Sequence, residues 1–188
     1  MEIITTFLSE ITNEKYTNCV SSLPETVQTR ILKKKNEEDR KLSCIGYFCA
    51  AEIYKKQENE DCEFAFLEGG KPVFSNGGFC FSISHSKDIV ITAVDNKNLG
   101  VDIEKVREIN LDLVKKVCTE REKEYLQGAK STQDQIIRFF EIWTAKEAYF
   151  KYSGTGIVGL KKVDYFEIKQ NIKRIEIPGY ILSVYSED

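Results

Sequence analysis

The sequence of 188 residues is short of histidine, of excess positive charge and of long apolar runs. It has one histidine and no Cys-x-x-Cys pair among its six cysteines, so a structural zinc site is not expected. The formal net charge is −3, and because nucleic-acid binders normally carry a basic surface, we expect no nucleic-acid partner. No stretch approaches the roughly 20 apolar residues that span a bilayer, so we expect no membrane partner. Together these shortages predict a reduced, cytoplasmic protein.

The residues that are present predict a folded protein that mixes helices and strands. Hydrophobic residues make up 41% of the chain and charged residues 30%, which is typical of a globular protein. Strands are predicted at 3–8, 62–67, 79–84, 89–94, 99–106, 163–168, 173–177 and 180–185, and helices at 10–22, from Pro24 onward, at 36–56 and at 132–152. Thr119 and Ser131 each begin a stretch that resembles a helix-capping box. Each half thus mixes helices with antiparallel strands, so we expect an α+β fold with a weakly marked boundary near residues 98–105.

Two carboxylates stand close together in the stretch Gly100-Val-Asp-Ile-Glu104, which is predicted to be a strand. Because side chains alternate along a strand, Asp102 and Glu104 are expected on the same face. Two carboxylates at this spacing repel unless a cation or proton stands between them, and their hard oxygen atoms suit Mg²⁺. The alternative is a half-buried strand whose polar face is simply solvated, which is the commoner outcome for a lone Asp-x-Glu pair.

A third carboxylate, Glu147, lies in the aromatic stretch FFEIWTAKEAYFKY at residues 139–152. At about 100° per residue, Glu147 projects into the same sector as Trp143 and Phe150, with Lys146 and Lys151 on its two edges. Burial of an unpaired carboxylate is costly, so this group must be protonated, paired or bound to a metal ion. Helical geometry leaves two interpretations equally open: a surface pair of Glu147 with Lys151, or a metal ligand with lysines beside a phosphate.

Two further candidates lie between the predicted strands. The only histidine, His85, ends the stretch FSISHS at 81–86, where it could donate to a phosphate or could be an ordinary structural histidine. The stretch GGKP at 69–72 is a turn that carries a lysine, and by itself it indicates nothing more. Three carboxylates, at least two lysines and a histidine could together hold Mg²⁺ and a diphosphate and transfer part of it. Because no cysteine or serine stands in the setting of a nucleophile, the acceptor hydroxyl is expected from a partner.

Two other functions remain open on the residues alone. A Mg²⁺-dependent nuclease or phosphodiesterase would also use carboxylates with lysine, although the acidic balance of the chain disfavours it. A binding module without catalytic activity is the second, and it would not need the intact set of carboxylates and lysines.

The motifs resemble those of the 4′-phosphopantetheinyl transferases, specifically the two-lobed Sfp type. The first family signature, G-[IV]-D-x-E, is matched by GVDIE at 100–104, and the second, [WF]-[STC]-x-K-E-[AS]-x-x-K, by WTAKEAYFK at 143–151. FSISHS is similar to the family stretch F-N-[IL]-S-H-S, with Ser82 in place of the usual asparagine, and GKP at 70–72 is a further family-like element. The resemblance runs from about residue 24 to residue 168.

The resemblance implies a role for each of these positions. Asp102, Glu104 and Glu147 would bind Mg²⁺, or Mn²⁺, at the diphosphate of coenzyme A, and Glu147 and Lys151 would be the catalytic residues. Contacts to coenzyme A would come from Lys71, Pro72, Ser84, His85, Lys146, Lys151, Arg30 and Ser43. Within that set, Lys71 and Pro72 would lie near the adenine end.

The resemblance also implies a fold and a reaction. Family members have two similar α+β lobes related by a pseudo-twofold, so we expect an N-terminal lobe at 1–100 and a C-terminal lobe at 101–188, with the cofactor between them. The reaction would be attack by a serine hydroxyl of an apo acyl or peptidyl carrier protein on the β-phosphate of coenzyme A, which releases 3′,5′-ADP. A monomer is expected because both sides of the cleft lie in one chain.

Overall fold

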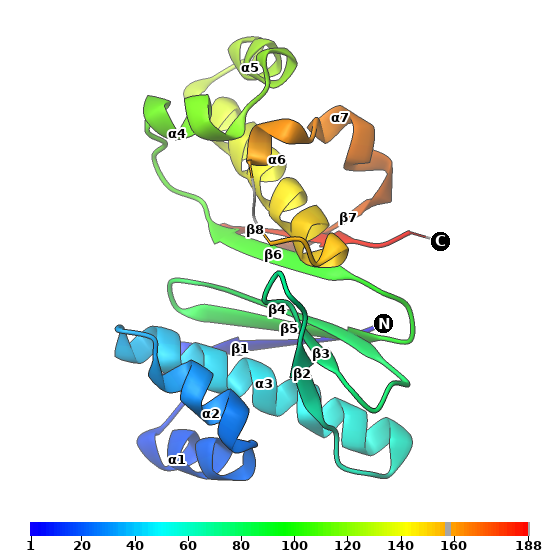
Figure 1. Cartoon of the computed structure of the whole chain (residues 1–188). Helices are drawn as coiled ribbons and strands as arrows, with labels where there is room; N and C mark the ends of the chain where they lie inside the picture. Colours follow the sequence, from blue (N-terminus) through cyan, green and yellow to red (C-terminus); the bar gives the residue numbers. More distant parts are fainter. Residues whose placement is uncertain (157–158, 188) are drawn as a thin grey trace.

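The computed structural model describes residues 1–156 and 159–187, which form two lobes, each with one three-stranded antiparallel sheet (Figure 1). The main helices lie on the two outer sides of the molecule and the two sheets lie between them, in a helix–sheet–sheet–helix order. The α+β fold class predicted from the sequence is therefore confirmed.

The N-terminal lobe has a sheet in the order β1-β5-β4, formed by Glu2–Phe7, Ile89–Asp95 and Cys80–Ser86. Its helices are α1 (Asn13–Ser22), α2 (Glu25–Leu32) and α3 (Glu37–Glu58). Helix α3 begins at Asn36, whose side chain accepts from two helix amides, and ends at Asn59 in a left-handed conformation with φ of 57°. A small hairpin of β2 (Phe64–Phe66) and β3 (Pro72–Phe74) follows α3, and β3 was not predicted because it has only three residues.

The C-terminal lobe repeats this order of elements. Its sheet has the order β6-β8-β7, formed by Gly100–Lys105, Tyr180–Tyr185 and Ile172–Ile177. Between β6 and the β7–β8 hairpin lie α4 (Leu111–Val117), α5 (Glu120–Gln127), α6 (Thr132–Ser153) and α7 (Tyr165–Ile168). Helices α3 and α6 are the long helix of their lobes, with 22 residues each. In each lobe a first strand is thus followed by helices and then by a hairpin that completes the sheet. This repetition is the pseudo-twofold relation expected of the fold.

An apolar core joins the two sheets face to face. Side chains alternate along β5, so that Val90 and Val94 pack with α3 whereas Ile91 belongs to the core between the sheets. In that core Ile91 shares one buried cluster with Val101 of β6 and Leu182 of β8, each 0–1% exposed. The two lobes therefore share buried apolar surface and do not meet through polar contacts alone.

The stretch 163–168 was predicted as a strand, and this prediction is wrong. The Asp164 side chain accepts a hydrogen bond from the Phe166 amide at 2.8 Å and begins α7. The Tyr165 amide donates to Glu122 Oε1 at 2.6 Å and is not bonded to a neighbouring strand. The alternation of apolar and polar residues in VDYFEI is strand-like, but the capping side chain decides the local structure.

The two predicted capping boxes have different outcomes. Thr119 Oγ1 accepts from the Glu122 amide, and the Glu122 carboxylate accepts from the Thr119 amide at 2.7 Å, so the box at the start of α5 is confirmed. Ser131 accepts from the Asp134 amide at the start of α6, but the Asp134 carboxylate accepts from the Lys130 amide and not from that of Ser131. None of the described helices is long and apolar enough to cross a membrane.

Candidate active site

Strand β6 and helix α6 approach one another closely at Gly100. A Cβ at this position would lie 2.0 Å from the Ala148 carbonyl oxygen and 2.5 Å from the Tyr152 amide nitrogen, which is closer than a side chain permits. The first position of the GVDIE motif therefore requires glycine. The close approach places the β6 carboxylates beside the last turns of α6, where Glu147 and Lys151 lie.

Asp102 is the most buried of the three carboxylates, at 3% exposure. Its Oδ1 accepts from Ser84 Oγ at 2.7 Å and from Lys151 Nζ at 2.7 Å. Its Oδ2 is buried and has no hydrogen-bond partner among the described residues. Burial raises the pKa of Asp102, while the Lys151 ammonium and the Ser84 hydroxyl oppose that rise. A buried, half-satisfied carboxylate of this kind is costly in the absence of a further positive charge.

Glu104 lies two residues further along β6 and is half-buried. Its Oε2 accepts two hydrogen bonds, from Ser86 Oγ at 2.9 Å and from Arg107 Nη1 at 2.8 Å. The Arg107 guanidinium lies over the ring of Phe140, 5.1 Å from its centre, so the arginine reaches Glu104 from the α6 side. The N-terminal lobe and the C-terminal lobe thus each contribute one donor to this carboxylate.

Glu147 supplies the third carboxylate, from α6. Its Oε1 accepts a hydrogen bond from the Trp143 indole nitrogen at 2.6 Å. Burial and the nearby Asp102 charge raise the pKa of Glu147 to about 8, although Lys151 and the indole bond favour the charged form. The interpretation of Glu147 and Lys151 as a surface pair is not supported, because the Lys151 ammonium pairs with Asp102.

The three carboxylates fit a divalent cation by charge and by donor type. The pKa of Asp102 and that of Glu147 are both raised, and one Asp102 oxygen lacks a partner within the described chain. A cation beside these groups would offset the repulsion and the burial cost, and their hard oxygen donors suit Mg²⁺ or Mn²⁺. Across residues 1–156 and 159–187, no three His, Cys, Asp or Glu side chains already stand close enough to hold a metal ion. The three carboxylates therefore do not form a ready-made metal cluster in the part of the chain that the structure describes.

A basic pocket of about 180 Å³ lies in the N-terminal lobe. It is lined by Arg30, Lys34, Ser43 and His85, together with apolar neighbours. Lys34 Nζ lies 3.5 Å from His85 Nε2, and burial together with the Lys34 charge lowers the pKa of His85. The structure therefore brings together three residues predicted to contact coenzyme A, Arg30, Ser43 and His85, and adds Lys34 to them.

A groove of about 350 Å³ adjoins this pocket, with which it shares Pro72 and Ile83. Its lining also includes Lys71 and Lys151, and the Lys151 ammonium pairs with Asp102. The Lys71 ammonium donates to Asn98 Oδ1 at 2.7 Å and to the Tyr152 carbonyl oxygen at 3.1 Å. Burial lowers the pKa of Lys71. The side chain of Lys71 therefore ties the N-terminal lobe to the end of α6 at the edge of the groove.

Comparison with known proteins identifies the family. Residues 98–180, which contain all three carboxylates, match the family model of the 4′-phosphopantetheinyl transferase superfamily. The chain is 30% identical over 154 residues to the 4′-phosphopantetheinyl transferase Sfp of Bacillus subtilis (strain 168), a match that covers 80% of this chain and 67% of Sfp. The chain belongs to the 4′-phosphopantetheinyl transferase superfamily. Its two-lobed fold and both sequence signatures agree with the Sfp type.

Two more members of the superfamily give shorter matches. The chain is 39% identical over 99 residues to the transferase gsp of Aneurinibacillus migulanus, covering 53% of this chain and 41% of gsp. It is 34% identical over 118 residues to the transferase HetI of Nostoc sp. (strain PCC 7120 / SAG 25.82 / UTEX 2576), covering 59% of this chain and 49% of HetI. The matches to these two relatives thus span less than half the length of each.

Lys146, part of the second superfamily signature, was predicted to face phosphate, and the structure places it elsewhere. Its side chain is 0% exposed, and its ammonium donates to Glu122 Oε2 at 2.6 Å and to the Val117 carbonyl oxygen at 2.8 Å. The five-residue separation from Lys151 corresponds to about 140° around the helix, so the two lysines cannot face the same way. Lys146 therefore stabilises the C-terminal lobe and does not line the groove.

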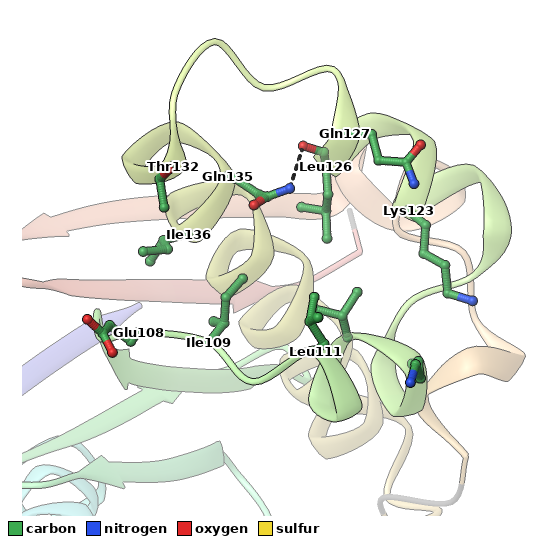
Figure 2. A pocket seen from close by; sticks show the side chains of 11 residues that line it. Glu108, Ile109, Leu111, Lys123, Leu126, Gln127, Thr132, Gln135 and Ile136 are labelled. Atoms are coloured by element: carbon green, nitrogen blue, oxygen red, sulfur yellow. Dashed lines mark hydrogen bonds between the residues drawn. The ribbon is translucent and has the colours of Figure 1, made fainter.

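A further hollow lies in the C-terminal lobe of this superfamily member, away from the predicted site residues (Figure 2). It has a volume of about 600 Å³ and is lined by apolar and polar side chains of α4, α5 and α6 and of the segment before α4. Leu111, at its rim, is 74% exposed. None of the residues predicted to bind coenzyme A or a metal ion lines this hollow.

Three side chains near the superfamily motifs were missed by sequence reasoning. Ser86 carried a signal, because it lies two residues after Ser84 on a strand and so shares its face. Lys34 is the middle residue of a run of three lysines, and the sequence does not single it out. Arg107 follows β6 in an irregular segment, so its contact with Glu104 depends on the path of the chain and not on a pattern.

Proposed function

We propose that this protein transfers the 4′-phosphopantetheine arm of coenzyme A to a serine hydroxyl of an apo acyl or peptidyl carrier protein and releases 3′,5′-ADP, in a reaction that requires Mg²⁺. One observation carries the proposal. Lys151, which pairs with the buried Asp102 carboxylate and lies near Glu147, lines a groove that adjoins the pocket of Arg30 and His85. The sequence relatives named above are called 4′-phosphopantetheinyl transferases, which supports the same reaction.

The carboxylates would hold the metal ion. Asp102, Glu104 and Glu147 provide oxygen donors from two elements, β6 and α6, whose separation is fixed by the contact at Gly100. Mg²⁺, or Mn²⁺ in its place, would neutralise charge on the diphosphate and on the oxygens that gain charge during transfer.

Lys151 is proposed to bind the phosphoryl group that is transferred. Its side chain is one-quarter exposed and lines the groove, and its ammonium donates to Asp102 at 2.7 Å. A lysine fixed by a buried carboxylate loses little conformational freedom when it meets a phosphate, so it can stabilise the developing charge directly.

Glu147 is proposed to accept the proton of the attacking serine. The serine oxygen would form a bond to the β-phosphorus, the bond from that phosphorus to the bridging oxygen would break, and 3′,5′-ADP would leave with the bonding electrons. The Trp143 bond occupies Oε1, so we assign the proton to Oε2. The charged form of Glu147, which the Lys151 ammonium and the indole bond favour, is the form that can accept this proton.

The basic pocket is proposed to bind the 3′-phosphate end of coenzyme A. Arg30, Lys34 and His85 bring positive charge and hydrogen-bond donors to one small cavity, and Ser43 adds a hydroxyl. The Lys71–Pro72 segment would contact the rest of the nucleotide along the groove, and Ser84, whose hydroxyl donates to Asp102, would contact coenzyme A beside the carboxylates. Because one chain supplies both ends of the groove, we propose a monomer as the active form, working in the cytoplasm without nucleic acid or membrane.

The test mixes the protein with an apo carrier protein, coenzyme A and Mg²⁺ and measures the intact mass of the carrier. We expect the gain of one phosphopantetheine arm, which EDTA abolishes and which a carrier with its acceptor serine changed to alanine does not show. No gain across several acyl and peptidyl carriers would contradict the proposal. Cleavage of plasmid or single-stranded DNA with Mg²⁺ would instead favour a nuclease.

The role of Glu147 is tested in the same assay with Glu147→Gln. We expect the transfer rate to fall by about 100-fold or more, since a positioned general base typically contributes at least that much. Near-normal transfer by a folded Glu147→Gln protein would remove Glu147 from the mechanism.

A further inference from the structure

Three serines of β4 join the two lobes at the metal site. Ser82, Ser84 and Ser86 occupy alternate positions of the strand, so their side chains lie on one face. Strands β4 and β6 belong to different sheets, yet each of these hydroxyls accepts a hydrogen bond from a β6 amide: Val101 to Ser82 at 3.0 Å, Ile103 to Ser84 at 3.3 Å and Lys105 to Ser86 at 3.1 Å. We call this set of contacts the serine ladder.

The ladder also reaches the carboxylates, at two of its three positions. A serine hydroxyl has one proton to donate and can accept as well. Ser84 donates that proton to Asp102 Oδ1 at 2.7 Å, and Ser86 donates its proton to Glu104 Oε2 at 2.9 Å. Ser82 makes the amide contact and has no carboxylate partner within the described residues. Ser84 and Ser86 thus bridge the backbone and a carboxylate of β6, while Ser82 binds the backbone alone.

We propose that Ser86 is a positioning residue of the cation site, which orients the Glu104 carboxylate from the opposite lobe and makes cation affinity depend on the contact between β4 and β6. This inference rests on the Mg²⁺ site proposed above. It goes further by assigning a role to a residue that makes no direct contact with the metal ion.

Arg107, the second hydrogen-bond donor to Glu104, shows by comparison why the Ser86 hydroxyl matters. Arg107 bonds to the same oxygen, Oε2, but its side chain is 41% exposed, whereas Ser86 is 7% exposed on a strand inside the protein. Without the Ser86 hydroxyl, Glu104 would be held by the more exposed donor alone. Outer hydrogen bonds of this kind fix the direction of a metal-binding carboxylate and favour its charged form, and their loss typically costs about 10–100-fold in metal affinity.

The test is a titration with Mn²⁺ alone, monitored by the relaxation of water protons, which responds to protein-bound Mn²⁺. We expect Ser86→Ala to weaken binding by about 10-fold or more, and Ser86→Thr, which keeps the hydroxyl, to recover most of the affinity. Ser82→Ala is the matched control, because it also removes an acceptor of a β6 amide but touches no carboxylate. We expect it to lower the melting temperature about as much as Ser86→Ala and to leave Mn²⁺ affinity close to wild type.

Each remaining outcome of this titration counts against a defined claim. Equal Mn²⁺ affinities for Ser86→Ala and wild type would overturn the positioning role while leaving the cation site intact. Equal losses of affinity in Ser86→Ala and Ser82→Ala would also overturn it, because the effect would then come from lobe contact in general. Absence of Mn²⁺ binding in the wild type, matching an Asp102→Asn reference, would overturn the cation site and with it the role of Ser86.

Discussion

Helix α6 provides the lysine of two lysine–carboxylate pairs, which are similar in composition but have different roles. Lys146 pairs with Glu122 at 2.6 Å, and Lys151 pairs with Asp102 at 2.7 Å. Both acids are buried, at 0% and 3% exposure. The difference lies in how completely the remaining polar atoms of each pair are satisfied.

The pair in the C-terminal lobe has a partner for each carboxylate oxygen. Glu122 Oε1 accepts from the Tyr165 amide, and Oε2 accepts from the Thr119 amide as well as from Lys146. The Lys146 ammonium also binds the Val117 carbonyl oxygen. This network links the end of α4, the start of α5, α6 and α7, so its function is to hold four elements of the lobe together.

The pair in the groove is incomplete by comparison. Asp102 Oδ2 lacks a partner among the described residues, the neighbouring Glu147 has a pKa raised to about 8, and Lys151 remains one-quarter exposed. Such a site costs stability in the free protein and gains from a ligand that supplies positive charge. Both sites contain an ion pair with a buried carboxylate, so the presence of an ion pair does not distinguish a structural pair from a functional one. The distinguishing feature is whether every polar atom of the pair has a hydrogen-bond partner.

The largest expected effect on stability comes from breaking the satisfied pair. Lys146→Met should lower the free energy of unfolding by about 3–5 kcal/mol, because it leaves Glu122 charged, buried and without its cation. Urea unfolding followed by circular dichroism measures the change. Lys115→Met is the control: its pair with Asp112 is exposed at 3.3 Å, and its loss should cost less than about 1 kcal/mol. Similar losses in the two variants would contradict the structural role of Lys146.

Changing the incomplete pair should affect folding less and function more. Asp102→Asn removes a buried charge that repels Glu147, and Lys151 is exposed enough to reach water, so we expect the free energy of unfolding to change by less than about 1 kcal/mol. Mn²⁺ binding and transfer to the carrier should both be lost. A destabilisation as large as that of Lys146→Met would show that the two pairs are equivalent after all.

The last expected effect is a pH dependence that belongs to Glu147. Its pKa is raised from 4.5 to about 8 in the folded protein, so between these values the folded state keeps a proton that the unfolded state has lost. Stability from this group is therefore present below about pH 4.5 and is lost as the pH rises toward about 8. Urea unfolding in EDTA should show Glu147→Gln gaining stability relative to wild type as the pH rises through this window. A difference that does not depend on pH would show that Glu147 titrates normally.

The sequence predicted the fold class and most elements because their patterns are local. The β-branched apolar run of β5 and the capping box at Thr119 depend on residues close together in the chain, and both were found. The strand predicted at 163–168 failed because Asp164 acts as a helix cap, which outweighs a weak alternation. Local patterns also could not show that β4 would bind β6 through serine side chains.

The candidate site could be predicted only in part from residue geometry. Asp102 and Glu104 share a strand face, but nothing local places them beside Glu147, which is 45 residues further along the chain than Asp102. Their grouping was expected from the family resemblance, and whether they bind a metal ion stays a prediction. Lys146 was misplaced because it was expected at the edge of the Glu147 sector, facing phosphate, whereas one residue turns a helix by about 100° and its ammonium pairs with Glu122.

The apolar core between the two sheets has a consequence for dividing the protein. Either lobe made alone would expose one whole face of its sheet, including Ile91 in the first lobe or Val101 and Leu182 in the second. Exposed faces of this kind make a fragment insoluble or drive it to associate. Neither half should thus serve as an independent building block, and a split version of the protein should work only when both halves are produced together and find each other while folding.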